Sequence, residues 1–235
     1  MRPVEKHSWG LTTEKAEDLQ RTLSARLTRQ TPFKDAGDVR TVAAVCVEQK
    51  KNDAPVSAAA AVFRLPDFQL LESSIVTEKP GKLFPYVPGL LSFRETPLFL
   101  KALKAVTDAD VLLVPGHGLA HPRRFGIACH LGLLMDRPSI GCADEKIFGD
   151  FEEPPPGLEG AYTLLRDGDE MIGAALRTRP NTAPLFVSPG HKMGVLMAVD
   201  IVMNCVRGNR APEPLRLLRQ LLREQPPARG RKGKR

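Results

Sequence analysis

The order of the predicted elements constrains the fold of this chain more than any other feature. Thr41–Val47 is short and almost wholly apolar, which is typical of a central strand of a sheet. Two further strands are predicted near Ser57–Arg64 and over Gln69–Glu78, because turn residues precede them at Asn52–Pro55 and at Leu65–Asp67. These short connections predict an antiparallel meander of three strands.

Helices and strands alternate outside the meander. Before it, Leu19, Leu23 and Leu27 recur every fourth residue between Thr13 and Gln30, which predicts an amphipathic helix. After it, we expect helices near Phe93–Val106, Arg124–Asp136, His191–Val206 and Leu215–Leu222, strands at Val111–Val114 and Pro138–Ala143, a hairpin within Tyr162–Thr178, and a strand that leads into a loop within Pro184–His191. This order predicts a ribonuclease H-like α/β fold. Helices would flank a mixed central sheet in which parallel strands follow the antiparallel meander.

Length and charge divide the chain into one domain and a short tail. The chain has 235 residues, and we expect a single domain over residues 1–224. Its net charge is +7, and five of the basic residues lie in Pro226–Arg235, which contains no acid. Because this segment is rich in Pro, Gly and charge, the tail, residues 225–235, is predicted to be disordered. The tail is either an arm that binds nucleic-acid phosphates regardless of nucleotide sequence or only a solubilising terminus.

The sequence lacks the signatures of several protein classes. No apolar run approaches the ~20 residues of a membrane span, and the N-terminus has no signal-peptide core, so we expect a cytoplasmic protein with no membrane partner. Four cysteines are present, namely Cys46, Cys129, Cys142 and Cys205. They form no Cys-x-x-Cys pair, so neither a zinc knuckle nor a disulfide framework is indicated, and we expect reduced, mostly buried thiols.

The stretch "PYVPGLLSFRE", Pro85–Glu95, has three recognisable parts. Two prolines bracket Tyr86 and Val87 and make a stiff loop that presents an aromatic ring, which suits a wedge between stacked bases. Tyr86 could equally be an ordinary surface aromatic. Gly89 then permits close approach of the backbone to a ligand, and Ser92-x-x-Glu95 fits the capping box of a following helix. Capping is the structural alternative to a chemical role for Glu95.

A second motif follows the predicted strand Val111–Val114. The chain breaks at Pro115-Gly116 and then presents His117, His121, Arg123 and Arg124 within a few positions. A strand that ends in a glycine loop rich in His and Arg indicates a ligand site. The structural alternative for each histidine is a hydrogen-bonded core or capping residue, but four of the five histidines fall in two motif stretches, Gly116–Leu134 and Val187–Met193.

These two stretches, together with "PSIGCA" and "VSPGHKM", resemble the endonuclease V family. The resemblance runs from the first predicted helix to Val206. It implies a ribonuclease H-like fold and a nuclease that nicks one strand at the second phosphodiester bond 3′ to hypoxanthine. Members act on DNA, RNA or both with Mg²⁺ or Mn²⁺, so nucleic acid, including single-stranded RNA, is the expected partner. We expect a monomer.

The resemblance also implies roles for individual residues. The family's strand-separating wedge matches Pro85, Tyr86, Val87 and Pro88. Its pocket for the flipped base matches Gly89, Leu90 and Gly116. The loop that organises substrate phosphates and the pocket matches His117, His121, Arg123 and Arg124. Two catalytic positions match Glu95, a metal-binding carboxylate, and His191, which lies near the scissile phosphate in the family.

This sequence departs from the family at three positions that serve catalysis. Two-metal hydrolysis holds two cations about 4 Å apart with carboxylates, but Cys46 and Pro115 stand where the family has metal-binding Asp residues, and Asp144 stands where it has a Lys. A thiol is a poor Mg²⁺ ligand, and proline offers only a carbonyl. Asp110 lies roughly 16 Å back along the strand and cannot substitute.

Three hypotheses follow from these departures. The first is an endonuclease V-like protein that binds nucleic acid at deaminated or branched sites but cleaves it poorly or not at all. The alternative is an active nuclease with a rebuilt metal site, in which Glu95 works with Asp144 or Glu145 and with His191. The third is a structural or partner-binding protein that keeps only the fold.

Overall fold

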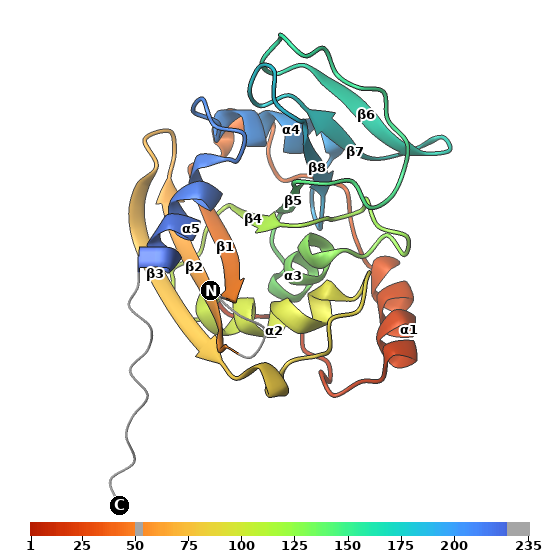
Figure 1. Cartoon of the computed structure of the whole chain (residues 1–235), viewed down its shortest axis with the longest axis vertical. Coiled ribbons are helices and arrows are strands. Elements are labelled where there is room, and N and C mark those ends of the chain that lie inside the picture. The colour runs from red at the N-terminus through yellow and green to blue at the C-terminus, as the bar shows by residue number, and fades with distance from the viewer. Residues whose placement is uncertain (50–53, 225–235) are drawn as a thin grey trace, which may run out of the picture.

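The computed structural model describes residues 1–49 and 54–224, which form one mixed sheet with helices on both faces (Figure 1). The strand order is β3-β2-β1-β4-β5-β8-β7-β6. The strands are β1 Thr41–Gln49, β2 Val56–Arg64, β3 Gln69–Glu78, β4 Val111–Pro115, β5 Ser139–Ala143, β6 Tyr162–Asp167, β7 Glu170–Leu176 and β8 Leu185–Pro189. The α-helices are α1 Thr13–Ser24, α2 Leu91–Leu103, α3 Ile127–Met135, α4 Val195–Asn204 and α5 Glu213–Glu224.

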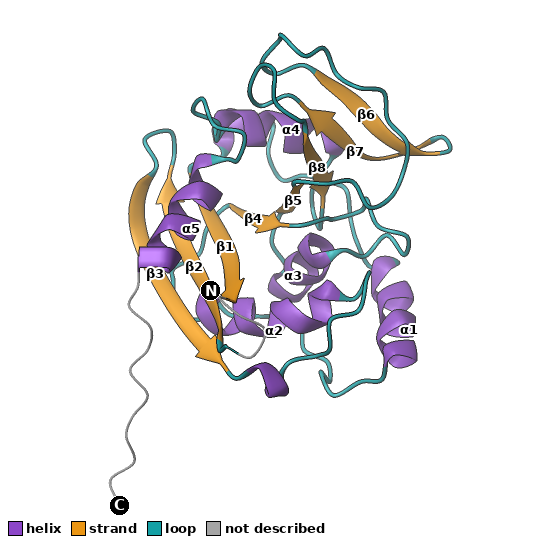
Figure 2. Ribbon diagram, in the orientation of Figure 1, coloured by secondary structure: helices purple, strands orange, loops and turns teal. Residues whose placement is uncertain are grey.

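The predicted sheet is confirmed. Strands β1, β2 and β3 pair as an antiparallel meander, and β4 and β5 continue from β1 in parallel (Figure 2). The hairpin of β6 and β7 turns at Gly168, where the φ angle is +57°. It joins the sheet through β8, which runs antiparallel to β5. The turn residues Asn52 and Asp53 and the predicted disordered tail lie outside the described residues.

Two hydrophobic clusters hold the helices against the sheet. Apolar side chains of α4 and α5 pack on one face, and those of α2 and α3 pack on the other. Helix α1 lies at the side of α2 and α3 in Figure 1, where its buried Ala16 packs with Leu90 and Phe93. All four cysteines are free and buried, as predicted. In the described part of the chain, no helix is long and apolar enough to cross a membrane.

The register of the central strands places the two substituted positions beside each other. Along β1, Val42, Ala44 and Cys46 face the side of the sheet that α5 covers, while Ala43 and Val45 face α2. Val42 pairs with Val111 of β4, and Ala44 pairs with Leu113. Continued by two residues, this register brings Cys46 level with Pro115 on the same face. Proline is tolerated there because it is the last residue of β4 and no further ladder hydrogen bond is needed.

The predicted capping box of Ser92 and Glu95 is wrong. Helix α2 begins at Leu91 after an N-cap at Leu90, and no side chain caps it. Ser92 therefore lies inside the first turn, where it is buried and its Oγ has no hydrogen-bond partner among the residues that the structure describes. Two helix starts also differ from the prediction. Helix α3 begins at Ile127, because Arg124 has a φ angle of +53°, and α4 begins at Val195.

Candidate functional site

A cavity of about 600 Å³ lies at the carboxyl ends of β4 and β5, where Pro115 and Ala143 line it. This end of parallel strands is where α/β folds usually bind ligands. Two loops form a large part of the remaining wall. They are the wedge segment, residues 85–88, and the pocket loop, residues 116–126. The cavity therefore lies between the two motifs that the sequence singled out.

Most of the predicted binding residues meet in this cavity. The predicted residues that line it are Tyr86, Val87, Pro88, Gly89, Gly116, His117, His121 and Arg123. Asp144 and Glu145, which follow β5, line it as well. Pro85 is exposed beside the cavity wall, and Leu90 is buried under it against Phe93.

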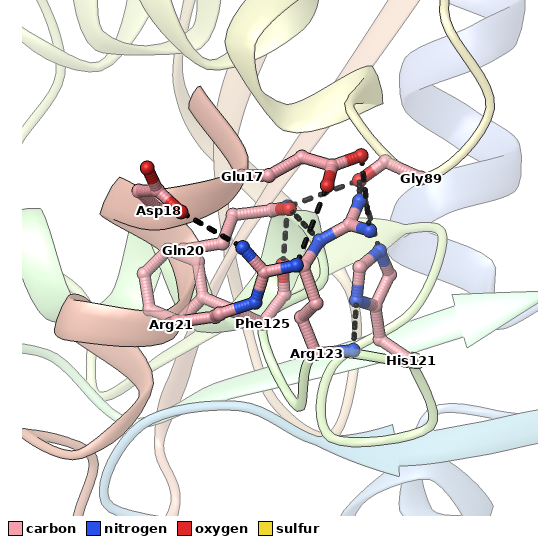
Figure 3. A network of polar contacts seen from close by, with 8 residues as sticks. All are labelled: Glu17, Asp18, Gln20, Arg21, Gly89, His121, Arg123 and Phe125. Atoms are coloured by element: carbon pink, nitrogen blue, oxygen red, sulfur yellow. Dashed lines mark hydrogen bonds and ion pairs between the residues drawn. The ribbon is translucent and has the colours of Figure 1, made fainter. Parts of the chain in front are cut away.

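Three donors converge on the carbonyl oxygen of Gly89 (Figure 3). Gln20 Nε2 lies 3.0 Å from it, His121 Nε2 lies 2.9 Å from it, and Arg123 Nη2 lies 3.1 Å from it. Gly89 itself has a φ angle of +79°, and a Cβ there would lie 2.8 Å from Arg123 Nη2. The end of the wedge segment is thus fixed to helix α1 and to the pocket loop.

The hydrogen bonds of His121 define its protonation state. Its Nδ1 accepts the backbone N–H of Arg123 at 3.1 Å, so Nε2 must carry the proton that is donated to Gly89. Burial, with a smaller contribution from the neighbouring charge of Arg123, lowers the pKa of His121 to about 4. His121 is therefore a neutral donor at physiological pH, and its role in the structure is to hold the wedge segment.

Gln20 is a functional residue that the sequence analysis missed. It is fully buried on α1, donates to the carbonyl oxygens of Gly89 and Phe125, and accepts Arg123 Nε at 2.6 Å. The available signal was its spacing, because Ala16, Gln20 and Leu23 share the buried face of the helix. A polar residue on such a face needs a partner inside the protein.

Tyr86 is the most exposed aromatic side chain of the site. It is 73% exposed, and it borders both the main cavity and a second cavity of about 460 Å³. The backbone around it is held at Gly89, while its ring faces solvent. An exposed ring on a fixed loop can stack on a base without reorganising the protein.

Arg124 lies in the pocket loop, but its side chain points to other partners. Its guanidinium pairs with Asp167 and with Glu170, the latter at 2.7 Å, and it stacks over the ring of Phe148 at 5.2 Å. Because these partners belong to the β6–β7 hairpin and the segment before it, Arg124 is turned away from the cavity. It does not line the cavity wall.

His191 also lies apart from the cavity. Its backbone pairs with Ser139, the first residue of β5, whereas the cavity lies at the other end of that strand. Its Nε2 lies 3.3 Å from Asp136 Oδ1. Burial lowers the pKa of the ring. In the structure His191 therefore does not line the cavity, and its role beside a phosphate stays a prediction.

The two positions where the family has aspartates carry no metal ligand of the usual kind. Cys46 is 1% exposed, and burial raises its thiol pKa to about 12, so the sulfur is protonated at neutral pH. Pro115 lines the cavity and offers only its carbonyl. In the parts of the chain that the structure describes, no group of three or more His, Cys, Asp or Glu side chains is arranged to hold a metal ion. The donor set does not fit a two-metal centre.

The acids proposed for a rebuilt metal site do not come together either. Glu95 lines the second cavity, on the α2 side of the sheet, and burial raises its pKa to about 7. Asp144 lines the main cavity, and Arg210 Nη1 binds its carboxylate at 2.8 Å. Glu145 lines the main cavity too, with an exposed side chain. Glu95 thus lines a different cavity from the two acids with which it was expected to act, although the two cavities share Tyr86 and Leu91 in their walls.

Arg219 is a second residue that the sequence analysis missed. It lies on α5, lines the main cavity, and is close enough to Cys46 and Cys142 to act electrostatically on both thiols. No hydrogen bond or ion pair engages its guanidinium among residues 1–49 and 54–224. Its sequence context, a leucine-rich amphipathic helix, gave no signal, because charged residues in such helices usually face solvent.

The comparisons with known proteins agree on one family. A sequence model of endonuclease V matches residues 21–219. The endonuclease V of Methanothrix thermoacetophila is 47% identical over 211 residues, which cover 90% of this chain and 91% of that protein. The structure of Bacillus subtilis endonuclease V superposes with a TM-score of 0.86 at 27% identity, covering 95% of this chain and 97% of the other. Ciona intestinalis endonuclease V was solved with a 24mer DNA containing an inosine followed by a ribo-adenosine. It shares the fold, with a TM-score of 0.77 at 24% identity, and the match covers 90% of this chain and 96% of that one. The predicted ribonuclease H-like fold is confirmed.

Proposed function

Because this chain belongs to the endonuclease V family, we propose that it binds nucleic acid at inosine, with the flipped base in the cavity between the wedge segment and the pocket loop, and that it cleaves weakly or not at all. Members of the family are metal-dependent nucleases. In this proposal the protein keeps the recognition of the base and has lost the hydrolysis of the phosphodiester bond.

One observation carries the recognition half of this proposal. The cavity is bordered by both motif loops, and three donors on the Gly89 carbonyl fix these loops to each other. A preformed pocket of this kind lowers the entropic cost of binding. The exposed ring of Tyr86 is available to fill the space that a flipped base leaves. The DNA-bound Ciona relative supports nucleic acid as the ligand.

The loss of cleavage is inferred from the chemistry of the donor set. A buried, protonated thiol at Cys46 and a proline at Pro115 cannot replace two carboxylates around hard cations. Glu95 and Asp144 border different cavities, so they offer no obvious substitute pair.

The proposal is tested with two measurements on the purified full chain. Fluorescence anisotropy compares a labelled strand that contains one inosine with the same strand containing adenosine, both as DNA and as RNA. We expect about 10-fold or tighter binding to the inosine strand. A nicking assay with Mg²⁺ or Mn²⁺ on the same strands should show no product. Equal affinity for both strands contradicts the recognition half, and metal-dependent nicks next to inosine contradict the other half.

A further inference from the structure

One cationic side chain of the main cavity, that of Arg219, forms no hydrogen bond or ion pair with the described residues. Arg123 and Arg219 both line the cavity. Arg123 is committed to the carbonyl of Gly89, to Gln20 and to Glu17. The guanidinium of Arg219, in contrast, has no hydrogen bond or ion pair within the described residues. We propose that Arg219 binds the nucleic-acid phosphate next to the base in the cavity, so that a guanidinium takes the place that metal ions hold in an active member of the family. This inference rests on the proposed function.

The position of Arg219 follows from the packing of α5. Leu215, Leu218 and Leu222 form the buried stripe of the helix and pack with Cys46 in the same hydrophobic cluster. Arg219 follows Leu218 directly and is half-buried, so it lies at the border of the stripe rather than on the solvent face. From there it lines the cavity together with Pro115. The cation is therefore next to both positions at which the family has metal-binding acids.

The surroundings of Arg219 do not neutralise its charge. Burial raises the pKa values of Cys46 to about 12 and of Cys142 well above the ordinary range, so both nearby thiols are neutral. The carboxylate of Asp144 is bound by Arg210. A half-buried guanidinium without a partner favours a bound anion, and its planar set of donors suits two phosphate oxygens at once.

A second unpartnered group points to a ligand in the same cavity. Ser92 lines the cavity and is 2% exposed, and its Oγ has no hydrogen-bond partner in the described structure. A buried hydroxyl without a partner is costly unless a ligand or water completes its hydrogen bond. Phosphate and ribose oxygens of a bound nucleotide can both accept from it.

One residue of the cavity opposes an anion. The carboxylate of Glu145 lines the cavity, and its side chain is exposed at the rim. Water and salt screen exposed charges strongly, whereas they screen the half-buried Arg219 less. We expect attraction by Arg219 to exceed this repulsion. Replacement of Glu145 by Gln should tighten binding to the inosine strand by about 2-fold.

The experiment removes the phosphate charge one linkage at a time. In strands with one inosine, a neutral methylphosphonate replaces each linkage flanking the inosine in turn, and affinities are measured in EDTA. We expect the wild-type protein to lose about 10-fold affinity at one linkage, and Arg219→Gln to lose no more than about 2-fold there. Arg219→Lys keeps the charge without the planar fork and should show an intermediate loss. Arg223→Gln is the matched control, because Arg223 lies one turn further along the exposed side of α5 and contacts Glu48 instead.

The outcomes separate the two proposals. If the wild-type protein prefers inosine but Arg219→Gln suffers the same loss as wild type at every linkage, the phosphate role of Arg219 is wrong while the proposed function stands. If wild-type binding to the inosine strand requires Mg²⁺, a metal ion holds the phosphate and the inference is overturned. If the wild-type protein has no preference for inosine, the proposed function fails and this inference fails with it.

Discussion

The carbonyl oxygen of Gly89 lies 2.9 Å from Nε2 of His121, a contact between two loops that are 32 residues apart in sequence. Because Nδ1 of the same ring accepts a backbone N–H, the ring is a neutral donor with a fixed orientation. Gln20 and Arg123 donate to the same oxygen. The shape of the cavity wall therefore depends on one carbonyl group, and Gly89, which directly follows the wedge segment, cannot move without breaking three hydrogen bonds.

Gly89→Ala should weaken inosine binding more than it weakens the fold. The new Cβ would lie 2.8 Å from Arg123 Nη2, and an L-residue at φ +79° costs about 1–2 kcal/mol. We expect about a 10-fold loss of affinity for the inosine strand, because Arg123 must shift. Gly168→Ala is the matched control, since it has φ +57° and open space around it. Both variants should lose a few degrees of thermal stability, and equal inosine affinity in the two would contradict the role of Gly89.

Tyr86→Ala should reduce binding to an inosine duplex by about 10-fold, because stacking of a ring on a base contributes about 1–3 kcal/mol. Its effect on thermal stability should be small, since the ring is 73% exposed. The loss should be larger for a duplex than for a single strand, where no neighbouring bases have to be separated. Tyr162→Ala, at an exposed tyrosine of the β6 edge strand, is the control and should leave both affinities unchanged. A Tyr86→Ala variant with wild-type affinity for the duplex rules out the wedge.

Acid should destabilise this protein at unusually mild pH. Burial lowers the pKa of each of its five histidines below the ordinary value of 6.5, that of His121 to about 4. Below about pH 6.5 the unfolded chain binds protons that the folded chain does not, so the free energy of unfolding falls as the pH falls toward the lowered pKa values. Glu95 acts in the opposite direction between pH 7 and its ordinary 4.5, because burial raises its pKa to about 7, but it is a single group.

The measurement is the thermal unfolding midpoint at a series of pH values from 7.5 to about 5, a range that begins above the ordinary histidine pKa of ~6.5. We expect a continuous decrease over this range. His130→Phe should make the decrease shallower, because His130 is fully buried among aromatic rings and its Nε2 lies 2.7 Å from His7 Nε2. A midpoint that stays constant from pH 7.5 to 5 contradicts the lowered pKa values.

Restoring the two aspartates should not be sufficient to restore a metal site. In Cys46→Asp/Pro115→Asp, the guanidinium of Arg219 is available to pair with the new carboxylates. We expect metal binding only when Arg219→Gln is added, seen as a rise of about 3 °C or more in the unfolding midpoint with Mn²⁺. Nicks next to inosine should appear in the triple variant and be absent from the double variant. A double variant that binds Mn²⁺ and nicks as well as the triple variant contradicts the position of Arg219.

The sequence predicted most elements because their signals are local. Thr41–Val47 is apolar enough to be a central strand, and the Leu19, Leu23 and Leu27 spacing indicated α1. The boundary errors lie where tertiary contacts override local preference. Ser92-x-x-Glu95 matches the sequence pattern of a capping box. Packing of Leu90 against Phe93, however, starts the helix at Leu91, so Ser92 lies inside it.

The sequence by itself determined the succession of strands and helices and the two motif loops. It also determined that Cys46 and Pro115 replace acids of the family it resembles. These are properties of neighbouring residues, and short-range periodicity and motif spacing encode them directly. Only the tertiary structure decided which charged groups reach the cavity. It turned Arg124 toward Glu170, left His191 at the far end of β5, and brought Gln20 and Arg219 into the wall from helices at opposite ends of the chain. These long-range contacts depend on how the helices pack across the sheet, and the local sequence pattern of neither helix contains that information.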